Sequence, residues 1–144
     1  MLDETNYKID KDNSLLILDD DQPFLKRLSL AMEKRGFSAV PVNSMADFSS
    51  IIDSVCPNYA IIDLRLSDGT GLDAVESIRS VNPDSKIVVL TGYGAIATAV
   101  AAIKIGAIDY LSKPADANDI LNALVFSDQR KLTKVLGFIQ LSFK

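Results

Sequence analysis

Five short apolar runs alternate along the chain with longer segments whose apolar residues recur at helical spacing. Each run is four residues long and rich in isoleucine, leucine or valine. Because the runs are rich in apolar residues rather than alternating apolar and polar, they predict strands buried on both faces of a parallel sheet rather than half-exposed strands. The runs cover residues 15–18, 39–42, 59–62, 87–90 and 108–111.

The segments between and after these runs predict five amphipathic helices, the fourth an alanine-rich helix over residues 95–105. Residues that favour helix ends stand at the expected places: Asp21 or Gln22 before Pro23, Gly36, Ser44, Gly106 and Asp116. The Gly-x-Gly pattern over residues 69–74 follows the third strand, so it predicts a turn and a helix entry rather than a dinucleotide site.

This alternation predicts an α/β fold, a doubly wound five-stranded parallel sheet in the flavodoxin-like order 2-1-3-4-5. A polar leader over residues 1–12 precedes the predicted domain over residues 13–127. In the tail over residues 128–144, apolar residues recur at helical spacing. The tail is interpreted as a terminal helix that makes contacts, and a frayed end or a removed output domain remain as alternatives.

Composition excludes several classes of function. The 144 residues carry 15 Lys and Arg against 19 Asp and Glu, and such an acidic chain is a poor nucleic-acid binder. The absence of histidine excludes histidine general bases and histidine-ligated metal sites, and a single cysteine excludes an intrachain disulfide. No apolar run approaches about 18 residues and no signal-peptide pattern opens the chain, so we expect a cytoplasmic protein.

Polar residues with complementary chemistry follow four of the predicted strands. Asp19 and Asp20 follow the first, Asp63 the third, Thr91 the fourth and Lys113 the fifth. The carboxyl ends of these strands meet at the same end of the sheet. Three carboxylates close together there need a cation to offset their repulsion, and oxygen ligands favour Mg²⁺. A hydroxyl and an ammonium beside them suit a phosphoryl group.

Each group has a simpler interpretation when taken alone. Acidic residues after a strand cap helices, and a single aspartate or threonine there forms turns. A lysine before proline is commonly a solvated surface residue. The coincidence of four strand ends is what favours a carboxylate that accepts a phosphoryl group.

The motifs that carry this chemistry resemble those of the response regulator receiver family, whose fold is the CheY-like form of the predicted sheet. Residues 63–66, 91–100 and 110–116 look most like the redox-responding global regulators of the RegA/PrrA/ActR type. The likeness covers about residues 13–127. It rests on residues 15–21, residues 61–64, Gly71, residues 90–91, Tyr110 and residues 113–114.

The resemblance implies that Asp63 accepts a phosphoryl group from a sensor histidine kinase. It implies that Asp20, Asp63 and the backbone carbonyl of Arg65 hold Mg²⁺, while Asp19 acts mainly through metal-bound water. Thr91 and Lys113 would bind the phosphoryl oxygens.

Tyr110 would act with Thr91 as a switch, and the Lys113–Pro114 peptide would be cis. The face made by the fourth helix, the fifth strand and the fifth helix would then change its partner, with a homodimer as one outcome. The alternative for the alanine-rich helix is that alanine is there only because it favours helix, with no functional role for that surface.

Two departures from the family pattern stand out. No proline-rich linker or basic helix-turn-helix follows the domain, so direct DNA binding is not expected of this chain. Ser67 stands where many receivers have proline, and we expect it to loosen the loop without removing a site group.

Two other functions fit the fold. A phosphorylation-independent interaction module would not need all five site residues. A flavodoxin-like cofactor carrier would need a hydroxyl-rich loop where this chain has residues 19–21, which are all aspartate.

Overall fold

The computed structural model describes residues 13–92 and 95–126. The predicted leader over residues 1–12 and the predicted tail over residues 128–144 lie outside the described residues. Within them, five parallel strands form one sheet in the order β2-β1-β3-β6-β7, which is the predicted 2-1-3-4-5 pattern. The strands are β1 (Ser14–Leu18), β2 (Ser38–Val42), β3 (Tyr59–Asp63), β6 (Lys86–Thr91) and β7 (Asp109–Ser112).

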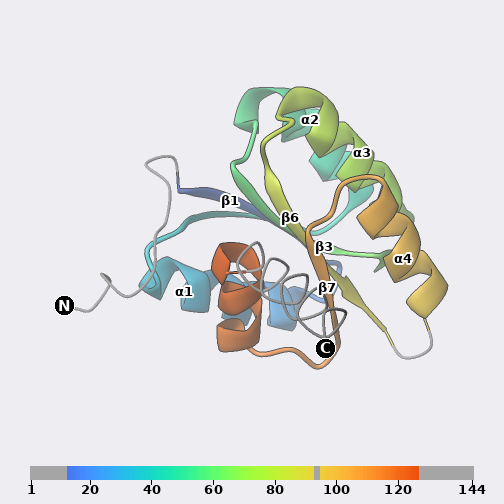
Figure 1. Cartoon of the computed structure of the whole chain (residues 1–144). Helices are drawn as coiled ribbons and strands as arrows, with labels where there is room; N and C mark the ends of the chain where they lie inside the picture. The colour runs from blue at the N-terminus through green and yellow to red at the C-terminus, as the bar shows by residue number, and fades with distance from the viewer. Residues whose placement is uncertain (1–12, 93–94, 127–144) are drawn as a thin grey trace, which may run out of the picture.

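Helices cover both faces of this sheet (Figure 1). On one face lie α2 (Met45–Val55), α3 (Gly71–Val81) and α4 (Ile96–Lys104), and on the other lie α1 (Gln22–Lys34) and the helix that includes residues 117–126. Alternate residues of one strand serve the two faces, as the pleat requires. Leu16 and Leu18 belong to the core under α2, α3 and α4, whereas Leu15 and Ile17 belong to the core under α1.

The prediction of fully buried strands is right for the centre of the sheet and wrong for its edges. Every residue of β3 is buried, and β1 and β6 are buried except at their first residue. In β2 only Val42 is buried, and no residue of β7 is fully buried. Each of these strands has a single neighbour in the sheet, so one side of its backbone lacks the cover that a second strand gives.

The predicted helix ends agree with the structure. The side chains of Asp21, Ser44 and Asp116 accept backbone N–H bonds from Phe24, Asp47 and Asp119 at 3.1, 3.1 and 2.9 Å. Gly36 and Gly106 adopt φ values of 101° and 124°, which glycine reaches without the steric cost met by other residues. Within the described residues, no helix is long and apolar enough to cross a membrane.

A short hairpin between β3 and α3 has no counterpart in the predicted elements. It pairs β4 (Arg65–Leu66) antiparallel with β5 (Gly69–Thr70), and α3 begins directly after it, in agreement with the predicted turn and helix entry. At Gly71 a Cβ atom would overlap the backbone oxygen of Asp63 and lie 2.9 Å from the Leu64 Cα. Glycine therefore lets the first turn of α3 lie against the end of β3.

Replacing Gly71 with alanine should lower the free energy of unfolding by about 1–3 kcal/mol, because the added methyl group meets backbone rather than a flexible side chain. Urea denaturation followed by circular dichroism measures this loss. Gly92→Ala is the matched control, since a Cβ there meets nothing within 4 Å. Equal stability of the two variants would contradict the close approach at Gly71.

Candidate functional site

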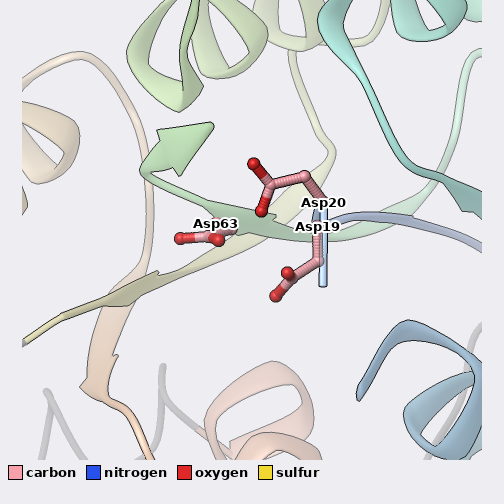
Figure 2. A group of neighbouring side chains, drawn as sticks. All are labelled: Asp19, Asp20 and Asp63. Atoms are coloured by element: carbon pink, nitrogen blue, oxygen red, sulfur yellow. The ribbon is translucent and has the colours of Figure 1, made fainter. Parts of the chain in front are cut away.

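Three carboxylates gather at the carboxyl ends of two central strands (Figure 2). Asp19 and Asp20 follow β1, and Asp63 is the last residue of β3. Each residue offers one oxygen, and these oxygens all lie within 4.8 Å of one another. Asp19 and Asp63 are only 1% and 6% exposed, so water screens their mutual repulsion poorly.

Backbone donors orient two of these carboxylates. The Asp21 N–H donates to Asp19 Oδ1 at 2.9 Å, and the Arg65 N–H donates to Asp63 Oδ1 at 3.1 Å. In both cases the donor lies two residues after the acceptor, where the chain turns away from the strand. The turns that end β1 and β3 therefore also fix the direction of the side chains.

Lys113 connects the carboxylates from the edge of the sheet. Its Nζ lies 2.7 Å from Asp19 Oδ2 and 3.4 Å from Asp63 Oδ2. The backbone places it there, because the Lys113 N–H donates to the Thr91 carbonyl oxygen at 2.8 Å. The Lys113–Pro114 peptide is cis, as the resemblance implies. The Nζ also lies 4.7 Å from the centroid of the Phe24 ring, within the range of a cation–π contact.

Two groups of the site have pKa values above their usual ones, for different reasons. Burial, and then the charge of Asp19, raise the pKa of Asp63, and they outweigh the Arg65 N–H and Lys113, which lower it. Burial alone would lower the pKa of Lys113. The hydrogen bond to Asp19 and the charges of Asp63 and Asp19 reverse that effect and hold the pKa above its usual value.

Thr91 ends β6 beside these groups. The Thr91 side chain is buried, and its Oγ1 has no hydrogen-bond partner among the described residues. A buried hydroxyl without a partner is energetically costly. Thr91 therefore offers an unused hydrogen-bond donor at the carboxyl ends of the strands, where the carboxylates lie.

Tyr110 lies in β7 opposite Val89, where it is half-buried and packs against the core under α2, α3 and α4.

The contacts of Ser67 contradict the expectation that this residue loosens its loop. Its backbone N–H and its hydroxyl both donate to Asp20 Oδ2, at 2.7 and 2.9 Å. The next residue, Asp68, accepts the backbone N–H groups of Met45 and Ala46 at 3.0 and 3.2 Å. The loop is thus tied to the site on one side and to the start of α2 on the other.

Ser67 and Phe24 are site residues whose roles sequence reasoning missed. The position of Phe24 in the first turn of a helix that directly follows β1 was a usable signal, because that turn borders the carboxyl ends of the strands. For Ser67 the signal was its hydroxyl and N–H in a loop beside acidic residues, although the partner depends on the path of the loop.

The donor set fits a small divalent cation. Three carboxylates and one ammonium leave two negative charges uncompensated, and all the available ligands are oxygens. Mg²⁺ prefers such oxygen ligands and keeps several waters, which leaves room for a phosphoryl oxygen. The residues present can therefore hold Mg²⁺.

Comparison with known proteins agrees with this chemistry. Residues 15–125 match the family described as response regulator receiver domain. The photosynthetic apparatus regulatory protein RegA of Rhodovulum sulfidophilum is 62% identical over 122 residues, which cover 85% of this chain and 67% of RegA. The acid tolerance regulatory protein ActR of Rhizobium meliloti is 56% identical over 81% of this chain and 60% of its own length. The chain thus spans about two thirds of these relatives.

Solved structures give the same result. A response regulator from Burkholderia pseudomallei, crystallised with a phosphorylated aspartic acid, a calcium ion and citrate, superposes with a TM-score of 0.77 at 32% identity. That match covers 88% of this chain and 75% of the other. A receiver domain from Clostridium thermocellum superposes with a TM-score of 0.74 at 28% identity, covering 85% of this chain and 98% of its own.

Removing the charge of Asp63 should stabilise the metal-free protein. Folding raises the pKa of Asp63, so its ionised form lowers the free energy of unfolding at neutral pH. This destabilisation is relieved as the pH falls through the raised pKa. We expect Asp63→Asn to raise the free energy of unfolding at pH 7 by about 0.5–2 kcal/mol, as measured by urea denaturation without Mg²⁺.

The exposed substitution Asp53→Asn, at the far end of α2, is the matched control and should change stability little. Mg²⁺ at about 100 times its dissociation constant should add about 2.7 kcal/mol to the wild type and less to Asp63→Asn. A variant less stable than wild type without Mg²⁺ would show that the three carboxylates do not repel one another as described.

Proposed function

The chain belongs to the response regulator receiver family, and we propose that it accepts a phosphoryl group on Asp63 from a sensor histidine kinase. One observation carries the proposal: the Asp63 carboxylate ends a buried central strand, in contact with Lys113 and beside two further carboxylates. A carboxylate held in this way can act as a nucleophile while the groups around it balance the charge that arrives.

In the proposed transfer, an Asp63 carboxylate oxygen forms a bond to phosphorus while the phosphorus–nitrogen bond of a phosphohistidine breaks. The histidine nitrogen keeps the electron pair of that bond, and a proton on the other ring nitrogen leaves the ring as a neutral imidazole. Asp20, Asp63 and the backbone carbonyl of Arg65 would hold Mg²⁺, with Asp19 acting on the ion through a water. When bound, Mg²⁺ supplies positive charge against the phosphoryl oxygens.

Lys113 and Thr91 are proposed to bind the phosphoryl group once it is on Asp63. Lys113 already touches Asp63, and its raised pKa keeps it charged at neutral pH. Thr91 brings a buried hydroxyl whose hydrogen-bonding capacity is unused among the described residues. A phosphoryl oxygen between the two would satisfy that hydroxyl and neutralise the ammonium.

Signalling would follow from movement of Thr91 and Tyr110. Thr91 and Tyr110 sit on adjacent strands, and inward movement of Thr91 would leave space for the Tyr110 ring. The surface that reports the change would be the α4–β7 face, made of α4, β7 and the helix of residues 117–126. On α4, Ile96 and Val100 are 54% and 43% exposed, which suits contact with a second copy of the chain.

The phosphoacceptor role is tested by intact mass after incubation with Mg²⁺ and acetyl phosphate. Wild type should gain about 80 Da, the mass of one phosphoryl group, and Asp63→Asn should gain none, because an amide is not a nucleophile of this kind. Asp53→Asn, the exposed control, should gain the same mass as wild type. Lys113→Ala should still be phosphorylated.

A gain on Asp63→Asn equal to that of wild type would place the acceptor elsewhere. No gain on either protein would favour the phosphorylation-independent interaction module.

The output surface is tested by charge substitution. Val100→Glu should weaken phosphorylation-dependent dimerisation about tenfold or more, because it places a carboxylate inside an apolar contact, while the mass gain on Asp63 stays unchanged. Sedimentation equilibrium with and without acetyl phosphate measures the dimer constant. Leu30→Glu, at an exposed apolar position on α1, should leave the dimer constant unchanged. Equal dimerisation of both variants would rule out the α4–β7 face.

A further inference from the structure

We propose that Ser67 positions Asp20 for Mg²⁺ and thereby sets the affinity of this chain for the ion. The inference rests on the proposed function, because it assigns a role toward the metal that the receiver reaction needs. It concerns the residue at which this sequence departs from the proline of many receivers. A proline at this position has neither an N–H nor a hydroxyl to donate.

Both donors of Ser67 act on the same atom. The N–H and the hydroxyl reach Asp20 Oδ2 at 2.7 and 2.9 Å, distances typical of charge-assisted hydrogen bonds. Asp20 Oδ1 carries no bond from Ser67 and remains available as a ligand. In Figure 2 one oxygen of Asp20 is directed toward Asp63 and the other away from it.

The Ser67 donors are themselves held in place from both sides. On one side, Leu66 is buried in the core under α2, α3 and α4. On the other, Asp68 accepts N–H bonds from the first two residues of α2, and these bonds lower the pKa of Asp68, so that its carboxylate stays charged. Ser67 therefore sits on a braced loop, and its two hydrogen bonds restrict the rotamer of Asp20.

A restricted ligand binds a metal more tightly than a free one, because less conformational entropy is lost on binding. Ser67 achieves this with neutral donors, so it adds no positive charge that would compete with the ion. An ammonium in its place would hold the carboxylate as well but would repel Mg²⁺. The structure thus assigns Ser67 to support of the metal ligand, although it lies four residues after the phosphoacceptor and is exposed.

The test is the dissociation constant for Mg²⁺ of the unphosphorylated protein, measured by isothermal titration calorimetry. Ser67→Ala removes one donor and should weaken binding about threefold, and Ser67→Pro removes both and should weaken it about tenfold. Ser54→Ala is the matched control, because the Ser54 hydroxyl donates to the Ile51 carbonyl oxygen within α2, away from the site. Urea denaturation without Mg²⁺ checks that each variant is folded, and Ser67→Ala decides the matter if Ser67→Pro does not fold.

The possible results separate this inference from the proposed function. If wild type binds no Mg²⁺, the metal-dependent function fails and Ser67 has no ion to serve. If wild type binds Mg²⁺ and both Ser67 variants bind it equally well, the site stands and the positioning role is wrong. Tighter binding by the variants would show that Ser67 competes with the ion for Asp20, which also overturns the inference.

Discussion

The site depends on the repulsion between carboxylates that the fold holds together. At about 4 Å and an effective dielectric constant near 20, two like charges repel by about 4 kcal/mol. Lys113 offsets part of this by touching both Asp19 and Asp63, but two negative charges remain uncompensated. Burial of Asp63, and then the charge of Asp19, raise the pKa of its carboxyl group. An arrangement that is unfavourable when empty is well matched to a cation and then to a phosphoryl group, which Mg²⁺ and Lys113 together can neutralise.

The sheet can sustain this repulsion because the acids stand on its most rigid part. β1 and β3 are central strands with buried side chains on both faces, so the carboxylates cannot separate without disturbing the core. The groups proposed to respond to phosphorylation lie on the other side of β3, Thr91 on its buried neighbour β6 and Tyr110 on the edge strand β7. A fixed acceptor at the centre and adaptable groups toward one edge allow a local charge change to reach the α4–β7 face.

Much of this fold was predictable, because burial on both faces of a parallel sheet leaves continuous apolar runs and strand ends converge at one edge. The helix caps at Asp21 and Ser44 were predictable for a similar reason, since each satisfies a backbone donor close by in the sequence. The contacts of Ser67 were not, because a serine in a loop carries no periodic signal and its partner lies 47 residues away. The partial exposure of β2 and β7 follows from the predicted strand order, which places them at the edges, but the short runs taken alone do not distinguish an edge strand from a central one.

The most direct test of the account is a crystal structure of the chain grown with Mg²⁺ and beryllium fluoride, a stable mimic of the phosphoryl group. We predict beryllium bonded to a carboxylate oxygen of Asp63, with fluorides contacting the Lys113 ammonium and the Thr91 hydroxyl. We also predict the metal between Asp20, Asp63 and the Arg65 carbonyl oxygen. Beryllium fluoride bound to another residue, or a metal held without Asp20 and Asp63, would contradict the central claim.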